Sequence, residues 1–194
     1  MTPPVYTPEE ARTRQTFLSL MWALSYPGKI HMLPFNGIEA FHAVADTLLD
    51  LETSYYCPDD ALALHLSRSG ARALDAESAA YHFYPHVEPS MMAGIGEART
   101  GTLLSPDLGA TLVVGCTLGT GTRFTLTGPG VPLAQPRTLT VESIPPAFWE
   151  LLANANRYPR GWDIYLIDGD QVVGLPRTTK MTLKAAAEPV GEAL

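Results

Sequence analysis

The chain has 194 residues, of which 46% are hydrophobic and 17% charged, a composition and length typical of one globular domain. A formal net charge of −7 without a cluster of basic residues excludes a nucleic-acid footprint. No apolar run is long enough to span a membrane, and Met1-Thr2-Pro3-Pro4 lacks the basic and apolar parts of a signal peptide, so we expect a cytoplasmic protein without a membrane segment.

The N-terminal part of the chain has the clearest helical signals. Thr7-Pro8-Glu9-Glu10 is a capping box with proline at the first helical position, and Tyr26-Pro27-Gly28 ends the helix. After an extended stretch over 29–33, Asn36-Gly37-Ile38-Glu39 is a second capping-box pattern, which predicts a helix over roughly 38–50. Helical spacing predicts that the first helix buries one face, formed by Phe17, Leu20, Met21 and Leu24.

The middle of the chain alternates between short strands and short helices. We expect strands over 52–57 and 80–84, a helix over 58–66, and a weaker helix over 89–98. The β-branched runs 110–116 and 123–127 are separated by a Gly/Thr stretch at 119–122, which predicts a β-hairpin.

The last third of the chain is rich in strands. A loop over 128–136 precedes a strand over 137–142, and Pro145-Pro146 begins a helix. Asp168-Gly169-Asp170 then predicts a hairpin turn between strands over 163–167 and 171–175.

These elements together predict the fold class. Strands separated by helices favour parallel pairing, whereas hairpins require antiparallel pairing, so we expect an α/β fold of three αβα layers around a mixed sheet. We expect a single domain over 1–194, with its core over about 8–183 and a tail over 184–194 that frays.

Most motifs that carry chemistry are absent from the sequence. We find no P-loop, dinucleotide fingerprint, Gly-x-Ser-x-Gly elbow or His-Glu-x-x-His motif. His82 and His86 have ligand-like spacing, but four residues of strand span about 13 Å, which is too far to share one metal. We therefore expect no metal site, and we interpret the isolated His31, His42 and His65 as structural side chains.

The lysines indicate a protein without a covalent cofactor, and the cysteines indicate a reducing compartment. Lys29 and Lys180 lie at element edges and Lys184 begins the tail, so none suits a Schiff base, which needs a desolvated pocket. Cys57 and Cys116 lie in separate apolar segments, and we expect free buried thiols, with a disulfide as the weaker alternative.

Pro176-Arg177-Thr178-Thr179 is the first candidate ligand site. A guanidinium followed by two hydroxyls suits a phosphate or phosphonate, because arginine binds such groups with two parallel hydrogen bonds. The alternative is structural: Arg177 pairs with a nearby carboxylate, Asp163 or Asp168, and the threonines continue a strand.

Two further segments are candidates. Leu126-Thr127-Gly128-Pro129-Gly130 has two glycines that allow a ligand to approach the backbone closely, or alternatively form a plain tight turn. Ser25-Tyr26-Pro27-Gly28 is explained by the end of a helix, or alternatively by contact with a partner subunit.

Taken together, five ordered blocks of the chain resemble the PhnH family, a subunit family of the bacterial carbon–phosphorus lyase machinery for phosphonate breakdown. The family has arginine where this chain has Leu18, and methionine where it has Leu24, but no block is lost. The blocks are Thr16 to Ile30, Thr47 to Thr53, Gly101 to Leu112, Leu126 to Val131, and Tyr158 to Lys180.

The resemblance implies a fold like the large domain of pyridoxal-phosphate-dependent transferases, without the cofactor. It implies a homodimer that joins subunits G, I and J and supports formation of α-D-ribose 1-methylphosphonate 5-triphosphate from ATP and methylphosphonate. Our first hypothesis is a non-catalytic scaffold. The second is a ligand-binding or catalytic subunit that contacts phosphonate or nucleotide through Arg177, Thr178 and Thr179. The third, from fold analogy alone, is pyridoxal phosphate binding.

Overall fold

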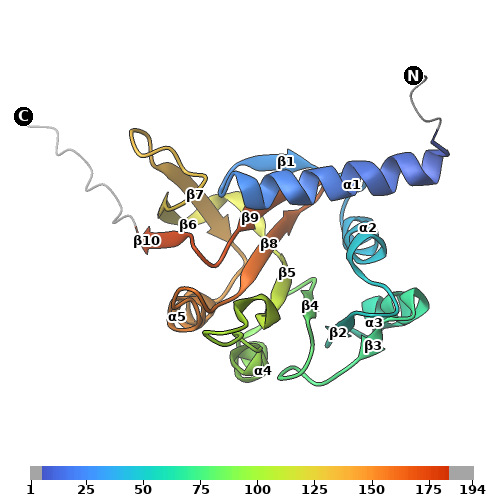
Figure 1. The fold of residues 1–194 in the computed structure, drawn as a ribbon. Coiled ribbons are helices and arrows are strands. Elements are labelled where there is room, and N and C mark those ends of the chain that lie inside the picture. Colours follow the sequence, from blue (N-terminus) through green and yellow to red (C-terminus); the bar gives the residue numbers. More distant parts are fainter. Residues whose placement is uncertain (1–5, 184–194) are drawn as a thin grey trace, which may run out of the picture.

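The structure, a computed structural model, describes residues 6–183. Its main sheet is built from β1 (Ile30–Met32), β2 (Ser54–Tyr56), β3 (Arg72–Ala73), β4 (Tyr81–Tyr84), β5 (Thr111–Gly115), β8 (Asp163–Asp168) and β9 (Gln171–Leu175). The strand order is β1-β9-β8-β5-β4-β2-β3 (Figure 1). Strands β3, β2, β4, β5 and β8 run parallel, while β9 and β1 pair antiparallel at one edge. The predicted mixed sheet is confirmed, and so is the hairpin that joins β8 to β9.

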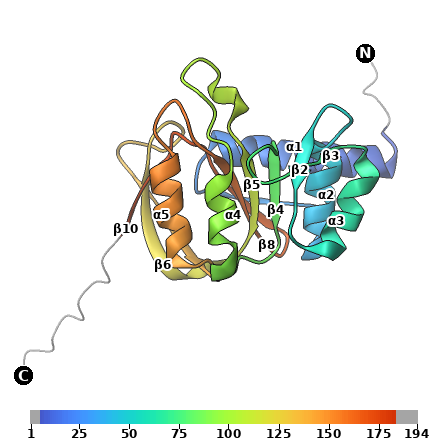
Figure 2. The same ribbon diagram turned by 90° about the horizontal axis from the view of Figure 1, so that it is seen from below.

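Helices cover both faces of this sheet. They are α1 (Pro8–Ser25), α2 (Ile38–Leu48), α3 (Asp60–Leu66), α4 (Met92–Glu97) and α5 (Pro146–Ala155). Alternate side chains of a strand point to opposite faces, so Val113 and Tyr165 pack in the core with α1, α2 and α3, whereas Leu112 and Ile164 pack in the core with α4 and α5. Figure 2 shows α4 and α5 side by side on their face. The α/β class with a mixed sheet is therefore confirmed.

A second, three-stranded antiparallel sheet packs on the same side as α4 and α5. It is formed by β6 (Thr117–Thr127), β7 (Arg137–Glu142) and β10 (Lys180–Leu183), in the order β10-β6-β7. The predicted hairpin between 110–116 and 123–127 is wrong, because β5 and β6 belong to different sheets. Gly119 and Gly121 have positive φ and lie at a register shift inside β6, so the stretch over 119–122 forms a bulge rather than a turn.

The two predicted capping boxes have different outcomes. At the start of α1, the Glu10 carboxylate accepts a hydrogen bond from the Thr7 amide at 2.8 Å and the Thr7 hydroxyl accepts one from the Glu10 amide at 3.2 Å, which confirms the first box. The Thr7 amide and the Thr7 hydroxyl both donate to the Glu10 carboxylate, and these two hydrogen bonds lower the pKa of Glu10. The second box is wrong: the N-cap of α2 is Gly37, with φ of 60° and no side-chain cap. Instead, the Gly37 amide donates to the carbonyl of Gly169 in the β8–β9 turn.

The predicted buried face of α1 is only partly correct. Leu20 is buried, but Phe17 and Met21 are 52% and 37% exposed, and the buried neighbours of Leu20 are Thr16 and Ala23. The reason is close packing on β9, where a Cβ added at Gly174 would lie 2.4 Å from the carbonyl carbon of Ala23. Small residues therefore face the sheet, and larger apolar ones are left on the outer face.

The strand β9 ends at Leu175, and β10 follows after a tight turn. The predicted fraying of 184–194 falls outside the described residues. Within residues 6–183, no helix combines the length and the apolar character that a membrane crossing requires.

Candidate functional site

The three segments proposed from the sequence meet at one junction in the fold. Thr127, at the end of β6, pairs in register with Lys180 of β10. A Cβ added at Gly128 would lie 2.7 Å from the carbonyl oxygen of Thr178, and one at Gly130 would lie 2.5 Å from that of Ser25. The protein's own backbone therefore occupies the space that these glycines leave open.

Arg177 is held by a carboxylate, as the structural alternative anticipated. Its guanidinium donates to both carboxylate oxygens of Asp163: Nη2 lies 2.5 Å from Oδ2, and Nε lies 3.2 Å from Oδ2 and 3.3 Å from Oδ1. Its backbone amide donates to Asp163 Oδ1 at 2.8 Å, and Nη1 donates to the carbonyl of Pro106. The two side chains are 16% and 21% exposed. Arg177 is thus the centre of a clasp formed by Arg177, Asp163 and Pro106.

The clasp joins three segments that are far apart in the sequence. A Cβ added at Gly109 would lie 2.4 Å from the carbonyl oxygen of Gly161 and 2.9 Å from Arg177 Nη1, so only glycine fits there without displacement. Beside it, the buried indole of Trp162 donates to the carbonyl of Ala98 at 3.0 Å. The sequence blocks around 101–112, 158–163 and 175–180 therefore pack against one another.

A large groove lies beside the clasp, between α5 and the small sheet, with a volume of about 990 Å³. Its apolar walls include Phe124, Trp149 and Met181, and the rings of Phe124 and Trp149 are 4.8 Å apart. Thr178 and Thr179 line one end, together with Arg177 and Lys180. The Thr179 hydroxyl is buried and has no hydrogen-bond partner among the described residues.

The hydroxyl of Ser25 is not directed to this groove. It donates to the carbonyl of Met21 at 2.8 Å, within its own helix. Instead, the end of α1 at Ser25 packs against the turn after β6. A Cβ added at Gly130 in this turn would lie 2.7 Å from the side chain of Pro27. The structure therefore brings Thr178 and Thr179 to the groove but not Ser25.

A second, smaller cavity of about 360 Å³ lies at the carboxyl ends of the parallel strands β4, β5 and β8, where α/β folds commonly bind ligands. Its polar residues are His86, Cys116, Thr117 and Ser143. The hydroxyls of Thr117 and Ser143 are 3.1 Å apart, and Ser143 has a φ of 69°. No sequence motif indicates this cavity, although several of its residues follow directly after predicted strands.

The cysteines are free, as predicted, but they are half-buried rather than buried, and neither is an activated nucleophile. Burial raises the pKa of Cys57 to about 11 and that of Cys116 to about 12. Both are therefore thiols rather than thiolates at neutral pH.

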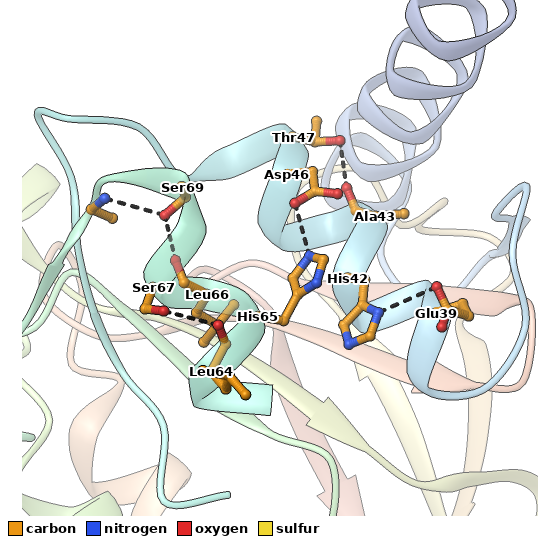
Figure 3. Close-up of polar contacts among 11 residues, drawn as sticks. Glu39, His42, Ala43, Asp46, Thr47, Leu64, His65, Leu66, Ser67 and Ser69 are labelled. Carbon is orange, nitrogen blue, oxygen red and sulfur yellow. Dashed lines mark hydrogen bonds and ion pairs between the residues drawn. The ribbon is translucent and has the colours of Figure 1, made fainter. Parts of the chain in front are cut away.

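The histidines divide into a buried residue and a stacked pair. His82 is fully buried, its Nδ1 lies 3.0 Å from the Tyr84 hydroxyl, and burial lowers its pKa to about 4. His42 and His65, which are isolated in the sequence, stack with ring centroids 3.8 Å apart. Figure 3 shows the pair between α2 and α3, with each ring bonded to a carboxylate, Glu39 or Asp46. Within residues 6–183, no three His, Cys, Asp or Glu side chains are arranged to hold a metal ion.

Comparisons with known proteins point to one family. The family profile described as bacterial phosphonate metabolism protein (PhnH) matches residues 4–182. A curated protein of Stutzerimonas stutzeri, named putative C-P lyase subunit protein HtxG, is 34% identical over 178 residues. This similarity covers 90% of the present chain and 88% of the relative.

Proposed function

Because the chain belongs to the PhnH family of bacterial phosphonate metabolism proteins, we propose that it is a subunit of the carbon–phosphorus lyase complex in phosphonate breakdown. Its role is that of a non-catalytic scaffold, in the cytoplasm, alongside subunits G, I and J. In this role it supports formation of α-D-ribose 1-methylphosphonate 5-triphosphate from ATP and methylphosphonate. The family match over 4–182 is the observation that carries this proposal.

The side chains that could take part in catalysis are bonded within the protein or protonated, which supports a scaffold rather than a catalyst. Arg177 is bonded to Asp163, Ser25 to its own helix, and the cysteine pKa values lie at about 11 and 12. Purified protein should therefore leave ATP and methylphosphonate unchanged when it is incubated with both, as read by phosphorus NMR. Conversion by the purified chain alone would refute the scaffold role.

We propose further that the chain forms a homodimer through the outer face of α1. Phe17 and Trp22 of this helix and Tyr26 at its C-terminal end are 52%, 43% and 42% exposed, and Ile30 and Met32 of the adjacent edge strand β1 are 48% and 49% exposed. The rings of Trp22 and Tyr26 stack with centroids 5.6 Å apart, so these two side chains form one apolar surface.

The dimer is tested by sedimentation of a Trp22→Asp variant. A charge in the centre of an apolar interface leaves a buried carboxylate unpaired, so this variant should be a monomer where the wild type is a dimer. Leu51→Asp, at a leucine that is 79% exposed elsewhere on the surface, is the control and should remain dimeric. A dimeric Trp22→Asp variant would contradict this interface.

The alternative function is binding of phosphonate or nucleotide through Arg177, Thr178 and Thr179. It is favoured by one observation: Thr179 lines the groove, and its buried hydroxyl has no hydrogen-bond partner among residues 6–183. Thr179→Val keeps the shape of the side chain and removes the hydroxyl, so calorimetry should detect a loss of affinity for ATP or methylphosphonate of about 0.5–1.5 kcal/mol. Equal affinity of the variant and the wild type would exclude this use of Thr179.

We also propose that the fold shares the layout of the large domain of pyridoxal-phosphate-dependent transferases without binding their cofactor. The resemblance in sequence supports the first part. The absence of the cofactor is supported by the lysines, because a Schiff-base lysine needs a desolvated pocket. Lys29 is exposed, with its Nζ 5.7 Å from the centroid of the Tyr26 ring, and Lys180 is exposed on β10. Lys184 falls outside the described residues. Adding pyridoxal phosphate should produce no aldimine absorbance beyond that of a lysine-matched control protein.

A further inference from the structure

The strand β10 lies at the margin of the small sheet and borders the groove. It pairs with β6 on one side, and in the order β10-β6-β7 its other edge has no strand partner among residues 6–183. Figures 1 and 2 both show β10 at the outside of the molecule. Every second residue of such an edge strand presents its backbone amide and carbonyl outward, and these groups form a template for another strand.

Two side chains of β10 with the same orientation line the groove. They are Met181 and Leu183, whereas Thr182, which lies between them in the sequence, does not line it. Lys180, at the start of the strand, also borders the groove. The opposite wall is α5, with Trp149 and Ala153, and Leu183 and Tyr158 are 68% and 79% exposed at the rim. A strand added beside β10 would place every second side chain on the same face as Met181 and Leu183, against α5.

We propose that β10 and this groove form a docking site for an extended segment of another subunit, which adds to the small sheet beside β10. Backbone hydrogen bonds to β10 provide affinity, and alternate apolar side chains in the groove provide specificity. The inference rests on the proposed role as a complex subunit and names the surface through which that role is exercised.

Size and charge indicate what kind of segment fits. A volume of about 990 Å³ lies at the upper end of small-ligand cavities, which hold roughly 300–1,000 Å³, and the groove follows an open strand edge rather than closing around a small molecule. A docked segment of five residues in strand conformation would extend about 16 Å along β10 and the groove. Lys180 makes no ion pair within residues 6–183 although the chain carries a net charge of −7, so a segment with a carboxylate at this end of β10 matches the site.

The composition of the chain's own C-terminal segment argues against it as the occupant. Residues 185–194 contain Val190 and Leu194 as their large apolar residues, and Pro189 lacks the amide that a strand ladder needs. A segment with alternate large apolar side chains fills the groove better, and we therefore assign the site to another subunit.

Two variants with the same substitution test the site in the assembled complex. Leu183→Asp puts a charge at the groove rim, and Leu64→Asp puts the same charge on α3, at a leucine of similar exposure, 65% against 68%. After co-expression with subunits G, I and J, Leu183→Asp should recover at least tenfold less of the partner subunits than the wild type. Leu64→Asp should recover wild-type amounts, and both variants should match the wild type in melting temperature.

A photoreactive benzophenone side chain at Leu183 then identifies the occupant by mass spectrometry. We expect a cross-link to a segment of another subunit with alternating apolar residues. A cross-link to residues 185–194 or to a second copy of this chain would overturn the proposal, as would equal partner recovery with both aspartate variants. If the wild type itself recovers no partner subunit, the proposed function fails. If the wild type and Leu183→Asp recover partners equally, only the docking site fails.

Discussion

Replacing Arg177 with alanine separates the structural clasp from an anion site. The substitution removes the hydrogen bonds of the guanidinium to Asp163 and to the carbonyl of Pro106, and it leaves the carboxylate in a site that is 21% exposed. Removing one member of a fully buried ion pair costs roughly 3–5 kcal/mol. Because partial exposure allows water to solvate Asp163, we expect a loss of about 2–3 kcal/mol in the free energy of unfolding.

Urea denaturation followed by circular dichroism measures this loss. For a domain of this size it corresponds to a fall of about 4–12 °C in melting temperature. Asp163→Ala and the double variant complete a thermodynamic cycle, in which we expect a coupling energy of about 1–2 kcal/mol. An Arg177→Ala protein with wild-type stability but weaker phosphonate or nucleotide binding would refute the clasp and favour the anion site.

Two further predictions concern packing and pH. Gly174→Ala should lower the free energy of unfolding by about 1–3 kcal/mol, because the new methyl group would lie 2.4 Å from the backbone of α1. Gly94→Ala in α4 is its control and should be neutral or stabilising by up to about 1 kcal/mol, since its nearest neighbour, the Tyr56 hydroxyl, lies 3.7 Å away. Burial lowers the pKa of His82 from 6.5 to about 4, so the unfolded chain binds the extra proton first and stability falls by roughly 3 kcal/mol as the pH drops across that interval. Urea denaturation of His82→Gln between pH 4 and pH 7 should lack this loss, and an unchanged pH dependence would contradict it.

The sequence predicted an element correctly where the interactions that form it join residues close together in the chain. The capping box of Thr7 and Glu10 involves residues three positions apart, and the β8–β9 hairpin depends on the turn at Gly169. Both were therefore predictable. The second capping pattern failed because Gly37 rather than Asn36 is the N-cap of α2. The Gly37 amide donates to the distant Gly169 carbonyl, an interaction that no local pattern encodes.

The errors share a physical origin in contacts between distant segments. Helical periodicity indicated a buried Phe17 and Met21, but it does not specify that α1 packs its backbone directly on Gly174. Positive φ at Gly119 and Gly121 suits a hairpin turn and a bulge equally well, and only the pairing of β6 with β7 decides between them.

At the candidate site, the sequence identified Arg177 as a residue of interest but did not decide what it binds. The sequence indicated that Arg177 binds either an anion or a carboxylate, Asp163 or Asp168. The choice of Asp163 depends on how β8 and β9 bring the two side chains together. The groove beside it was not predicted, because it is formed by β10 and α5, whose packing is a property of the tertiary fold.

Co-purification with the other carbon–phosphorus lyase subunits tests the central claim most directly. When the tagged chain is co-expressed with subunits G, I and J, native mass spectrometry of the purified material should detect one assembly that contains all of them. Recovery of the tagged chain alone, from cells in which the other subunits are present and folded, would contradict its assignment as a subunit of that complex.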